Sequence, residues 1–225
     1  MKGEWIERSG RPDLLLFFTG WGMDRRLADY LRSSAPDTAT YDLVVLYDYR
    51  DLSLPASLTG AMGAYGSVDL IAWSLGVWAA LHAGLDGIRR AVAINGTPFP
   101  VDASRGIPPE IFTGTLENWS DATRSRFERR MFAGSERDPR LDAVRSGRSS
   151  ADQREELHSI GLAATGDEVP AEPSWSFSKA VIGGRDLVFL PLNQRRAWQD
   201  TKSEELDAMP HFPFFHLPDW TEVLA

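Results

Sequence analysis

A serine between an apolar run and a segment of small residues is the first candidate for chemistry. Ser74 lies in LIAWSLGVWAA (70–80), which matches the G-x-S-x-G pattern of the nucleophile elbow except that Ala72 replaces the first glycine. A strand that turns directly into a helix leaves room only for small residues two positions before and after the serine, and Ala72 and Gly76 meet this demand. The pattern predicts a nucleophilic hydroxyl, and the alternative is a serine that only caps the helix.

An elbow serine needs an acid and then a histidine further along the chain, because the imidazole takes the serine proton and the acid orients the imidazole. Asp186 is the best acid, since it follows a strand-like run and a Gly-Gly pair. His82 falls in the helix after the elbow and His158 precedes the acid, so both are out of place. Order and spacing favour His211 as the base, and His216 remains open as its rival.

The loop after the first long apolar run could complete an oxyanion hole. It reads FFTGWGMD (17–24), and Gly20 and Gly22 let the backbone bend close to a substrate oxygen. The N–H of Trp21 would be one donor, and the N–H of Leu75, at the start of the helix after the serine, would be the other. The chain has no phosphate-loop or dinucleotide-binding glycine pattern and no histidines at metal-ligand spacing, so no metal and no cofactor are predicted.

Short apolar runs alternate with helix-like segments, and this alternation predicts the elements that must position these residues. Strands are expected at 14–18, 43–47, 68–73, 90–95 and 179–182, and helices at 24–33, within 53–66, at 75–83 and at 187–201. Residues 5–7 are expected to form a hairpin with the first of these strands, and the tail to end in a helix from Pro218. The pattern predicts an α/β fold with a mostly parallel central sheet and helices on both faces.

The composition changes between residues 97 and 173, where strand signals are few. Two amphipathic helices are expected at 120–132 and 150–162, and prolines punctuate the segment. We interpret residues 97–173 as a helical cap inserted into a core that consists of residues 1–96 and 174–225.

Overall composition limits the classes of function. The chain has 225 residues, of which 43% are hydrophobic, and this is enough for a sizeable core. A formal charge of −8 argues against nucleic acid as a partner, and the lack of cysteine excludes a disulfide framework, a thiolate metal site and a cysteine nucleophile. The charged N-terminal segment lacks the apolar region of a signal peptide, and the nearby apolar run has five residues, too few to span a membrane. A cytoplasmic protein without a membrane partner is expected.

Taken together, these residues make the chain similar to the α/β-hydrolase superfamily. Within it, the chain resembles the BioG family, the pimeloyl-[acyl-carrier protein] methyl ester esterases of biotin synthesis. The likeness covers most of the chain and rests on FFTGWG (17–22), YDYRDL (47–52), AWSLGVW (72–78), AINGTPFP (93–100) and PHFPF (210–214). The resemblance implies the α/β-hydrolase fold, with Ser74 as nucleophile, Asp186 as acid and His211 as base. It also implies Trp21 and Leu75 as oxyanion donors and an acyl carrier protein as partner.

The implied reaction raises a problem of selectivity, because the enzyme must cleave the methyl ester at the far end of the acyl chain and spare the thioester to the carrier. A channel with apolar walls would place the ester at the serine and leave the carrier outside. Aromatic residues often only fill cores, but they are the available wall residues. The candidates are Trp21, Trp73, Phe99, Phe112 and Phe132.

An acidic carrier would need a basic surface, and one stretch of this acidic chain has one. Residues 124–148 contain eight arginines against four acids, a local excess of +4. We interpret the arginines at the start of this stretch as candidates for docking, and a solvated helix with internal ion pairs is the alternative. These candidates are Arg124, Arg126, Arg129 and Arg130.

Two other functions fit the same residues. A thioesterase or general acyl hydrolase would keep the serine, acid and histidine and break a different bond. A non-catalytic pseudo-hydrolase would bind acyl carriers without cleaving them. The sequence leaves the oligomeric state, the preferred acyl chain length and the fold of the cap open.

Overall fold

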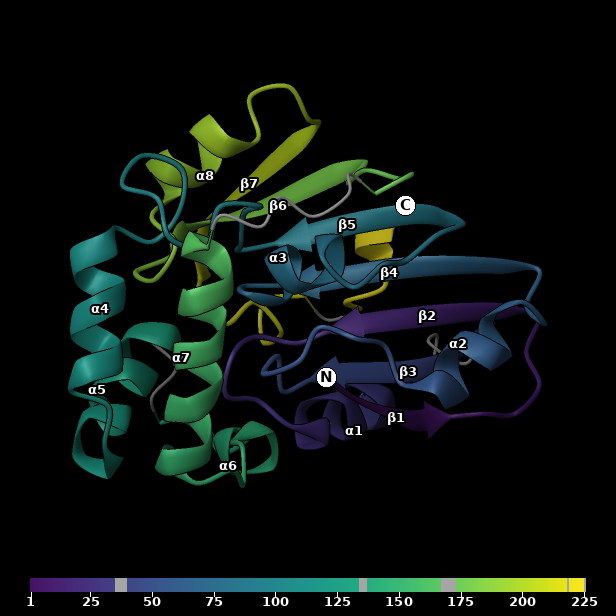
Figure 1. Cartoon of the computed structure of the whole chain (residues 1–225), viewed down its shortest axis with the longest axis horizontal. Helices are drawn as coiled ribbons and strands as arrows, with labels where there is room; N and C mark the ends of the chain where they lie inside the picture. Colours follow the sequence, from purple (N-terminus) through teal and green to yellow (C-terminus); the bar gives the residue numbers. More distant parts are fainter. Residues whose placement is uncertain (35–39, 134–136, 167–172, 218, 225) are drawn as a thin grey trace.

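A twisted β-sheet with helices on both faces forms the centre of the protein (Figure 1). The computed structural model describes residues 1–34, 40–133, 137–166, 173–217 and 219–224. Its strands are β1 (Lys2–Glu7), β2 (Asp13–Phe18), β3 (Tyr41–Tyr47), β4 (Ser67–Trp73), β5 (Ile88–Ile94), β6 (Lys179–Arg185) and β7 (Ser203–Pro210). Its helices are α1 (Arg25–Ser34), α2 (Ala56–Met62), α3 (Gly76–Leu81), α4 (Pro109–Glu117), α5 (Asp121–Met131), α6 (Leu141–Val144), α7 (Ser150–Thr165), α8 (Pro191–Ala197) and the 3₁₀ turn η2 (Glu222–Leu224).

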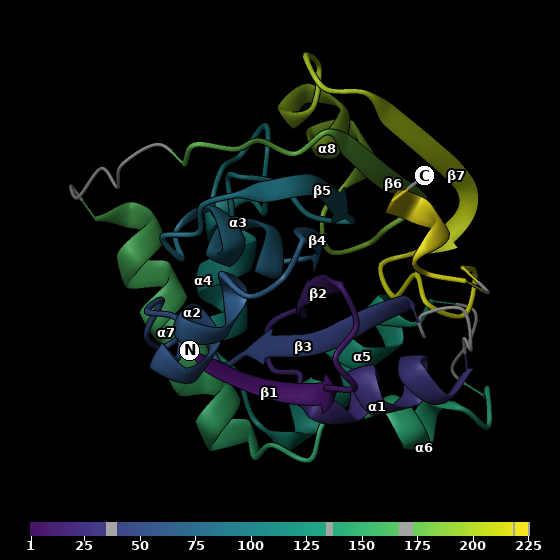
Figure 2. The ribbon, with the colours of Figure 1, turned by 90° about the vertical axis from the view of Figure 1, so that its right-hand side faces the viewer.

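The strand order is β1-β3-β2-β4-β5-β6-β7, with β1 antiparallel to its neighbour and the other pairs parallel. Figure 2 shows β1 and β7 at opposite edges of the sheet. The mostly parallel sheet confirms the predicted α/β class. It arises because strands alternate with helices along the chain, so that each connection crosses over and starts the next strand in the same direction.

The predicted hairpin between residues 5–7 and the strand at 14–18 is wrong. β1 pairs with β3 instead, from Lys2 opposite Tyr47 to Glu7 opposite Leu43. The buried carboxylate of Asp42, in β3, explains the difference, because it accepts backbone N–H groups of the loop between β1 and β2. This loop therefore passes across the start of β3, and β3 lies between the two strands.

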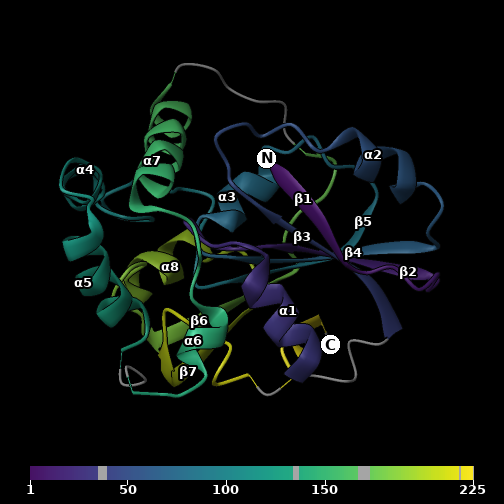
Figure 3. The same ribbon diagram turned by 90° about the horizontal axis from the view of Figure 1, so that it is seen from below.

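Both faces of the sheet are buried, which explains the continuous apolar run of β2. Leu16 belongs to the apolar cluster that includes Val77 of α3. Leu15 and Phe17 belong to the opposite cluster, which includes Leu27 of α1. Figure 3 shows α2 and α3 on one side of the sheet and α1 on the other. Successive residues of a strand point to opposite faces, so a strand buried on both faces forms a nearly continuous apolar run.

Four helices between β5 and β6 lie across the carboxyl ends of the central strands (Figure 1). α5 and α7 correspond to the two helices expected there, whereas α4 and α6 were not predicted. The division of the chain into a core and a cap at 97–173 stays a prediction, and residues 167–172 of that cap lie outside the described part of the chain.

The C-terminal third differs most from the prediction. The helix expected at 187–201 spans only Pro191–Ala197, and an unpredicted strand, β7, follows it. Most of β7 is exposed and acidic (SEELDAMP), so it lacks the apolar alternation that marks a strand. The expected C-terminal helix is only the turn η2, and Pro218, its expected start, is not among the described residues. No described helix is long and apolar enough to cross a membrane.

Candidate active site

Ser74 lies on a tight turn between β4 and α3. Its φ angle is 59°, in the left-handed region that residues with a side chain rarely adopt. A Cβ atom at Gly76 would lie 2.4 Å from the carbonyl oxygen of Thr19, and one at Gly96 would lie 2.2 Å from that of Ser74. The backbone thus passes so close on two sides that only glycine fits at both positions. This is the elbow geometry that the sequence predicted.

Three side chains from separate loops form one hydrogen-bonded chain. The Nε2 atom of His211 lies 3.0 Å from the Oγ of Ser74, and its Nδ1 lies 2.9 Å from the Oδ2 of Asp186. All three residues are at least 95% buried. They follow β4, β6 and β7, whose carboxyl ends meet at one edge of a parallel sheet. The arrangement has the order and distances of a Ser-His-Asp triad.

The carboxylate of Asp186 is surrounded by donors. Its Oδ1 accepts the backbone N–H groups of Val188 (2.7 Å) and Phe189 (2.9 Å), and its Oδ2 accepts the side-chain amide of Gln194 (3.0 Å). With His211 as the fourth donor, the buried charge is fully hydrogen-bonded. Because the Oδ2 of Asp186 accepts this hydrogen bond, the proton of the neutral imidazole lies on Nδ1 of His211. This leaves Nε2 as the acceptor for the hydroxyl of Ser74.

The backbone of His211 is held by Trp73, a predicted wall residue, and by Asn95, which sequence reasoning did not assign to the site. Its carbonyl oxygen accepts from the indole N–H of Trp73 (2.8 Å) and the side-chain amide of Asn95 (3.0 Å). The Oδ1 of Asn95 also accepts from the backbone N–H of Gly183 (2.6 Å) in β6. Asn95 therefore joins β6 to the loop that carries His211. The signals for it were a polar residue at the end of an apolar run and its place in AINGTPFP (93–100).

The other histidines lie elsewhere. His158 and His216 are exposed, and the Nδ1 atom of His82 lies 2.7 Å from the carbonyl oxygen of Trp78 in its own helix. Partial burial and the nearby Arg140 and Arg185 lower the pKa of His216. Of the two late candidates, the structure places His211 beside the serine.

A narrow cavity of about 40 Å³ lies over Ser74 and His211. Gly20, Trp21 and Leu75 also line it, which brings both predicted oxyanion donors to the serine. Among the described residues, no acceptor takes the backbone N–H of Trp21 or of Leu75. Free backbone donors of residues that line a cavity beside a nucleophile can bind the negative oxygen of a tetrahedral intermediate.

Three of the five predicted wall residues line this cavity: Trp21, Trp73 and Phe112. Phe99 and Phe132 are not among its lining residues. The guanidinium carbon of Arg105 lies 3.7 Å from the ring centroid of Phe99. Phe132 packs against Phe212 with ring centroids 4.8 Å apart. The lining also includes residues that sequence reasoning missed, because their positions in the helices between β5 and β6 and in loops carry no pattern. These are Ile107, Ile111, Phe127, Met131, Leu157, Leu187 and Val188.

A groove of about 730 Å³ adjoins this cavity. Five residues line both spaces: Ile111, Thr115, Phe127, Arg130 and Leu187. The groove also holds three further arginines: Arg126, Arg129 and Arg185. Its one acidic lining residue is Glu110, so this part of the surface is strongly basic.

Arg124 differs from the other predicted docking residues. Its guanidinium donates to the carbonyl oxygens of Arg148 and Ser146, each at 2.8 Å, and its Nε lies 3.1 Å from Glu128. These contacts join α5 to the segment before α7. Arg124 thus stabilises the packing of α5 and is not among the lining residues of the basic groove. Within the described residues, no three His, Cys, Asp or Glu side chains gather as ligands of a metal would.

A family model and a solved relative identify the family of this chain. The family model for the pimeloyl-ACP methyl esterase BioG matches residues 1–223. The crystal structure of BioG from Haemophilus influenzae superposes with a TM-score of 0.85 at 30% identity, and the match covers 100% of both chains. An enol-lactonase from Burkholderia xenovorans, at 15% identity and a TM-score of 0.66, covers 99% of this chain and 94% of its own and shows the shared fold.

A malonyl-[acyl-carrier protein] O-methyltransferase from Bacteroides fragilis is 39% identical over 192 residues. The match covers 84% of this chain but only 37% of the methyltransferase. The chain thus spans little more than a third of the length of that relative.

Proposed function

Since this chain belongs to the BioG family of pimeloyl-ACP methyl esterases, we propose that it hydrolyses the methyl ester of a pimeloyl group carried on acyl carrier protein. The family is one of carboxylic ester hydrolases, and the resemblance noted in the sequence is confirmed. The observation that carries the proposal is the chain of contacts from Ser74 through His211 to Asp186, beside a cavity that shares five lining residues with a basic groove.

In the acylation step, the Oγ of Ser74 attacks the ester carbonyl while Nε2 of His211 takes its proton. The tetrahedral oxyanion accepts the backbone N–H groups of Trp21 and Leu75. The carbon–methoxy bond then breaks, and His211 returns the proton to the leaving methanol. An acyl-enzyme remains on the serine.

In the deacylation step, a water molecule attacks the acyl carbonyl and gives a proton to Nε2 of His211. The bond to the serine oxygen breaks, and the proton returns to that oxygen. The products are the free acid on its carrier and the regenerated enzyme. Throughout, the carboxylate of Asp186 keeps the imidazole in the reactive tautomer and stabilises its charged form.

The shape of the site supports selectivity for the terminal ester. The cavity over the serine is narrow and apolar, so it suits a methyl ester at the end of a hydrocarbon chain. The groove beyond it, lined by Arg126, Arg129 and Arg130, is open and basic. We place the thioester and the acidic carrier there, away from the nucleophile.

Replacement of the nucleophile tests the proposal. Ser74→Ala should abolish release of methanol from the carrier-linked methyl ester and leave the circular dichroism spectrum unchanged. Mass spectrometry of the wild-type product separates the two hydrolase functions, because an esterase leaves the free acid on the carrier and a thioesterase releases the chain. Undiminished hydrolysis by Ser74→Ala would refute the assignment of the nucleophile. Failure of the wild-type protein to react with a fluorophosphonate would favour the pseudo-hydrolase.

A further inference from the structure

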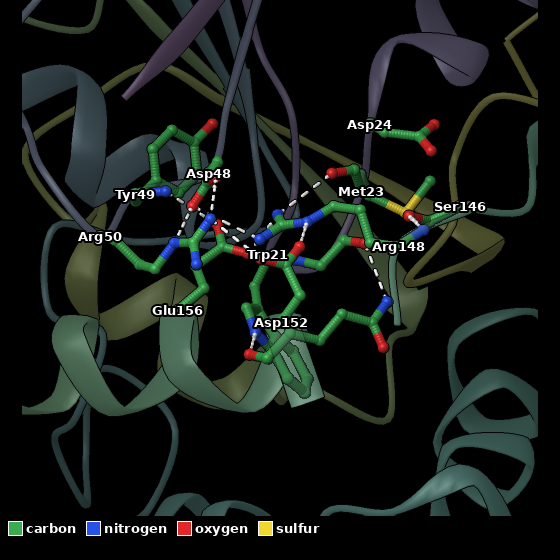
Figure 4. A network of polar contacts seen from close by, with 12 residues as sticks. Trp21, Met23, Asp24, Asp48, Tyr49, Arg50, Ser146, Arg148, Asp152 and Glu156 are labelled. Atoms are coloured by element: carbon green, nitrogen blue, oxygen red, sulfur yellow. Dashed lines mark hydrogen bonds and ion pairs between the residues drawn. The ribbon is translucent and has the colours of Figure 1, made fainter. Parts of the chain in front are cut away.

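A buried glutamate of the cap reaches the loop that carries the proposed oxyanion donor. Glu156, in α7, is completely buried. Its Oε2 accepts the backbone N–H of Gly22 (3.1 Å), and its Oε1 accepts that of Tyr49 (3.0 Å). One carboxylate thus holds two loops, which follow β2 and β3, against a helix more than 100 residues later in the chain. Figure 4 shows Glu156 close to Tyr49 and Arg148.

Arg148 forms an ion pair with Glu156 and balances its negative charge. Its Nη1 lies 2.6 Å from Oε2 of Glu156, and its side chain is 7% exposed. The same guanidinium contacts Asp152 and Asp48, at 2.5 and 3.4 Å (Figure 4). Burial raises the pKa of Glu156, and Arg148 and the two backbone donors oppose this rise. Both carboxylate oxygens accept N–H groups, which is the pattern of the ionised form.

The same helix holds the loop at two further points. The side-chain amide of Gln153 donates to the carbonyl oxygen of Gly22 (2.9 Å), and its backbone carbonyl accepts the indole N–H of Trp21 (2.7 Å). Gly22 has a φ of +74°, and a Cβ atom there would lie 3.0 Å from the Gln153 amide. Both polar groups of Gly22 and the side chain of Trp21 are therefore tied to α7. This leaves little freedom for the backbone N–H of Trp21.

We propose that Glu156 is a positioning residue of the oxyanion hole, which fixes the Gly22 backbone so that the N–H of Trp21 points at the substrate oxygen. The inference rests on the proposed function, because it needs Trp21 to be an oxyanion donor. A buried carboxylate is costly even when paired, and a neutral side chain could pack α7 on the sheet. The charged carboxylate of Glu156 would hold the glycine-flanked loop in one conformation during the reaction. This matters because a donor stabilises the transition state only when it is already in place.

The test compares Glu156→Gln with Glu155→Gln, which makes the same charge change at the neighbouring position. Glu155 is 69% exposed at its side chain and pairs with Arg50, in the loop after β3, but no hydrogen bond joins its side chain to Trp21 or Gly22. In Glu156→Gln, one amide oxygen cannot satisfy both backbone donors, so the loop loses an anchor. Removal of one oxyanion donor costs about 10²–10³-fold in kcat, and a displaced donor should cost about 10–100-fold. Glu155→Gln should stay within about twofold of the wild type.

Two substrates and an inhibitor separate positioning from a purely structural role. kcat should fall equally for the carrier-linked methyl ester and for methyl butyrate, with KM nearly unchanged, because the oxyanion forms in both reactions. The affinity for a trifluoromethyl ketone, which forms a tetrahedral adduct with serine, should fall in parallel with kcat/KM. The affinity for the product acid should not change. An effect on KM of the carrier-linked ester alone would overturn the proposal, since it would mean that Glu156 serves docking.

Wild-type kcat retained in a folded Glu156→Gln would also overturn it. If this variant does not fold, Gln153→Leu removes a single bond to Gly22, and the same selective loss of kcat is expected. Unchanged kinetics in Gln153→Leu would then refute the inference. Absence of ester hydrolysis by the wild-type protein itself would instead refute the proposed function on which it rests.

Discussion

Replacement of Asp186 by asparagine should inactivate the enzyme by reversing the hydrogen bonds of His211. Oδ1 of Asp186 accepts two backbone N–H groups, so the amide oxygen of the asparagine must occupy that position. The amide NH₂ then takes the place of Oδ2, facing Nδ1 of His211, and Nδ1 must become the acceptor. The proton moves to Nε2, which can no longer take the proton of Ser74.

The expected loss of kcat is about 10⁴-fold, or about 5 kcal/mol at about 1.4 kcal/mol for each factor of ten. The assay is methanol release from the carrier-linked ester, with thermal unfolding as a check of the fold. Gln194→Leu is the matched control, because it removes one donor to Oδ2 but leaves the tautomer of His211 unchanged. That variant should lose only about tenfold, the cost of one charge-assisted hydrogen bond. A loss below tenfold in Asp186→Asn would refute the assigned tautomer and the role of Asp186.

Three further predictions concern the elbow, the buried ion pairs and the groove. Gly76→Ala should destabilise the fold by about 3 kcal/mol in urea unfolding, because the new methyl group would meet the Thr19 carbonyl; a change below about 1 kcal/mol would contradict the elbow geometry. Burial would raise the pKa of Asp48, but its arginine and lysine partners lower it to about 2. The pKa of Asp48 in the folded state is thus below its unfolded value, so the ion pairs of Asp48 stabilise the fold above pH 4. Up to about 2 kcal/mol of unfolding free energy is lost as the pH falls towards 2. Asp48→Asn should flatten this dependence of stability on acid pH, and an unchanged slope would contradict the role of Asp48. Charge reversal at Arg126 and Arg130 should raise KM for the carrier-linked ester but not for methyl butyrate, and equal effects on both would argue against docking in the groove.

Local patterns of the sequence were sufficient for the elements around the serine. The strands at β2, β3, β4 and β5 were predicted because residues buried on both faces form continuous apolar runs. The elbow was predicted because a tight strand-to-helix turn admits only small residues, and Gly76 shows that limit in the structure. The chain order of Ser74, Asp186 and His211 followed from the order required in this fold.

Long-range pairing could not be predicted from these patterns. β1 was assigned to the wrong partner, because a short strand carries no signal for which neighbour it will join. β7 was missed, because an exposed edge strand does not need apolar alternation. Missing β7 affected the site, because His211 directly follows this strand. Phe99 and Phe132 were taken as wall residues on their type alone, and their packing partners lie elsewhere.

The sequence by itself determined which groups are available for the reaction: a serine on a tight turn, a late acid, a late histidine and a glycine-rich loop after the first buried strand. Those features depend on residue type and local backbone geometry, which a single segment already contains. Only the tertiary structure decided how they are held. Glu156 bonds to Gly22 across 134 positions of the chain, Asn95 to His211 across 116, and Gln194 to Asp186 across 8. A hydrogen bond requires its two atoms to meet in space, and where distant segments meet is decided by the packing of the whole chain.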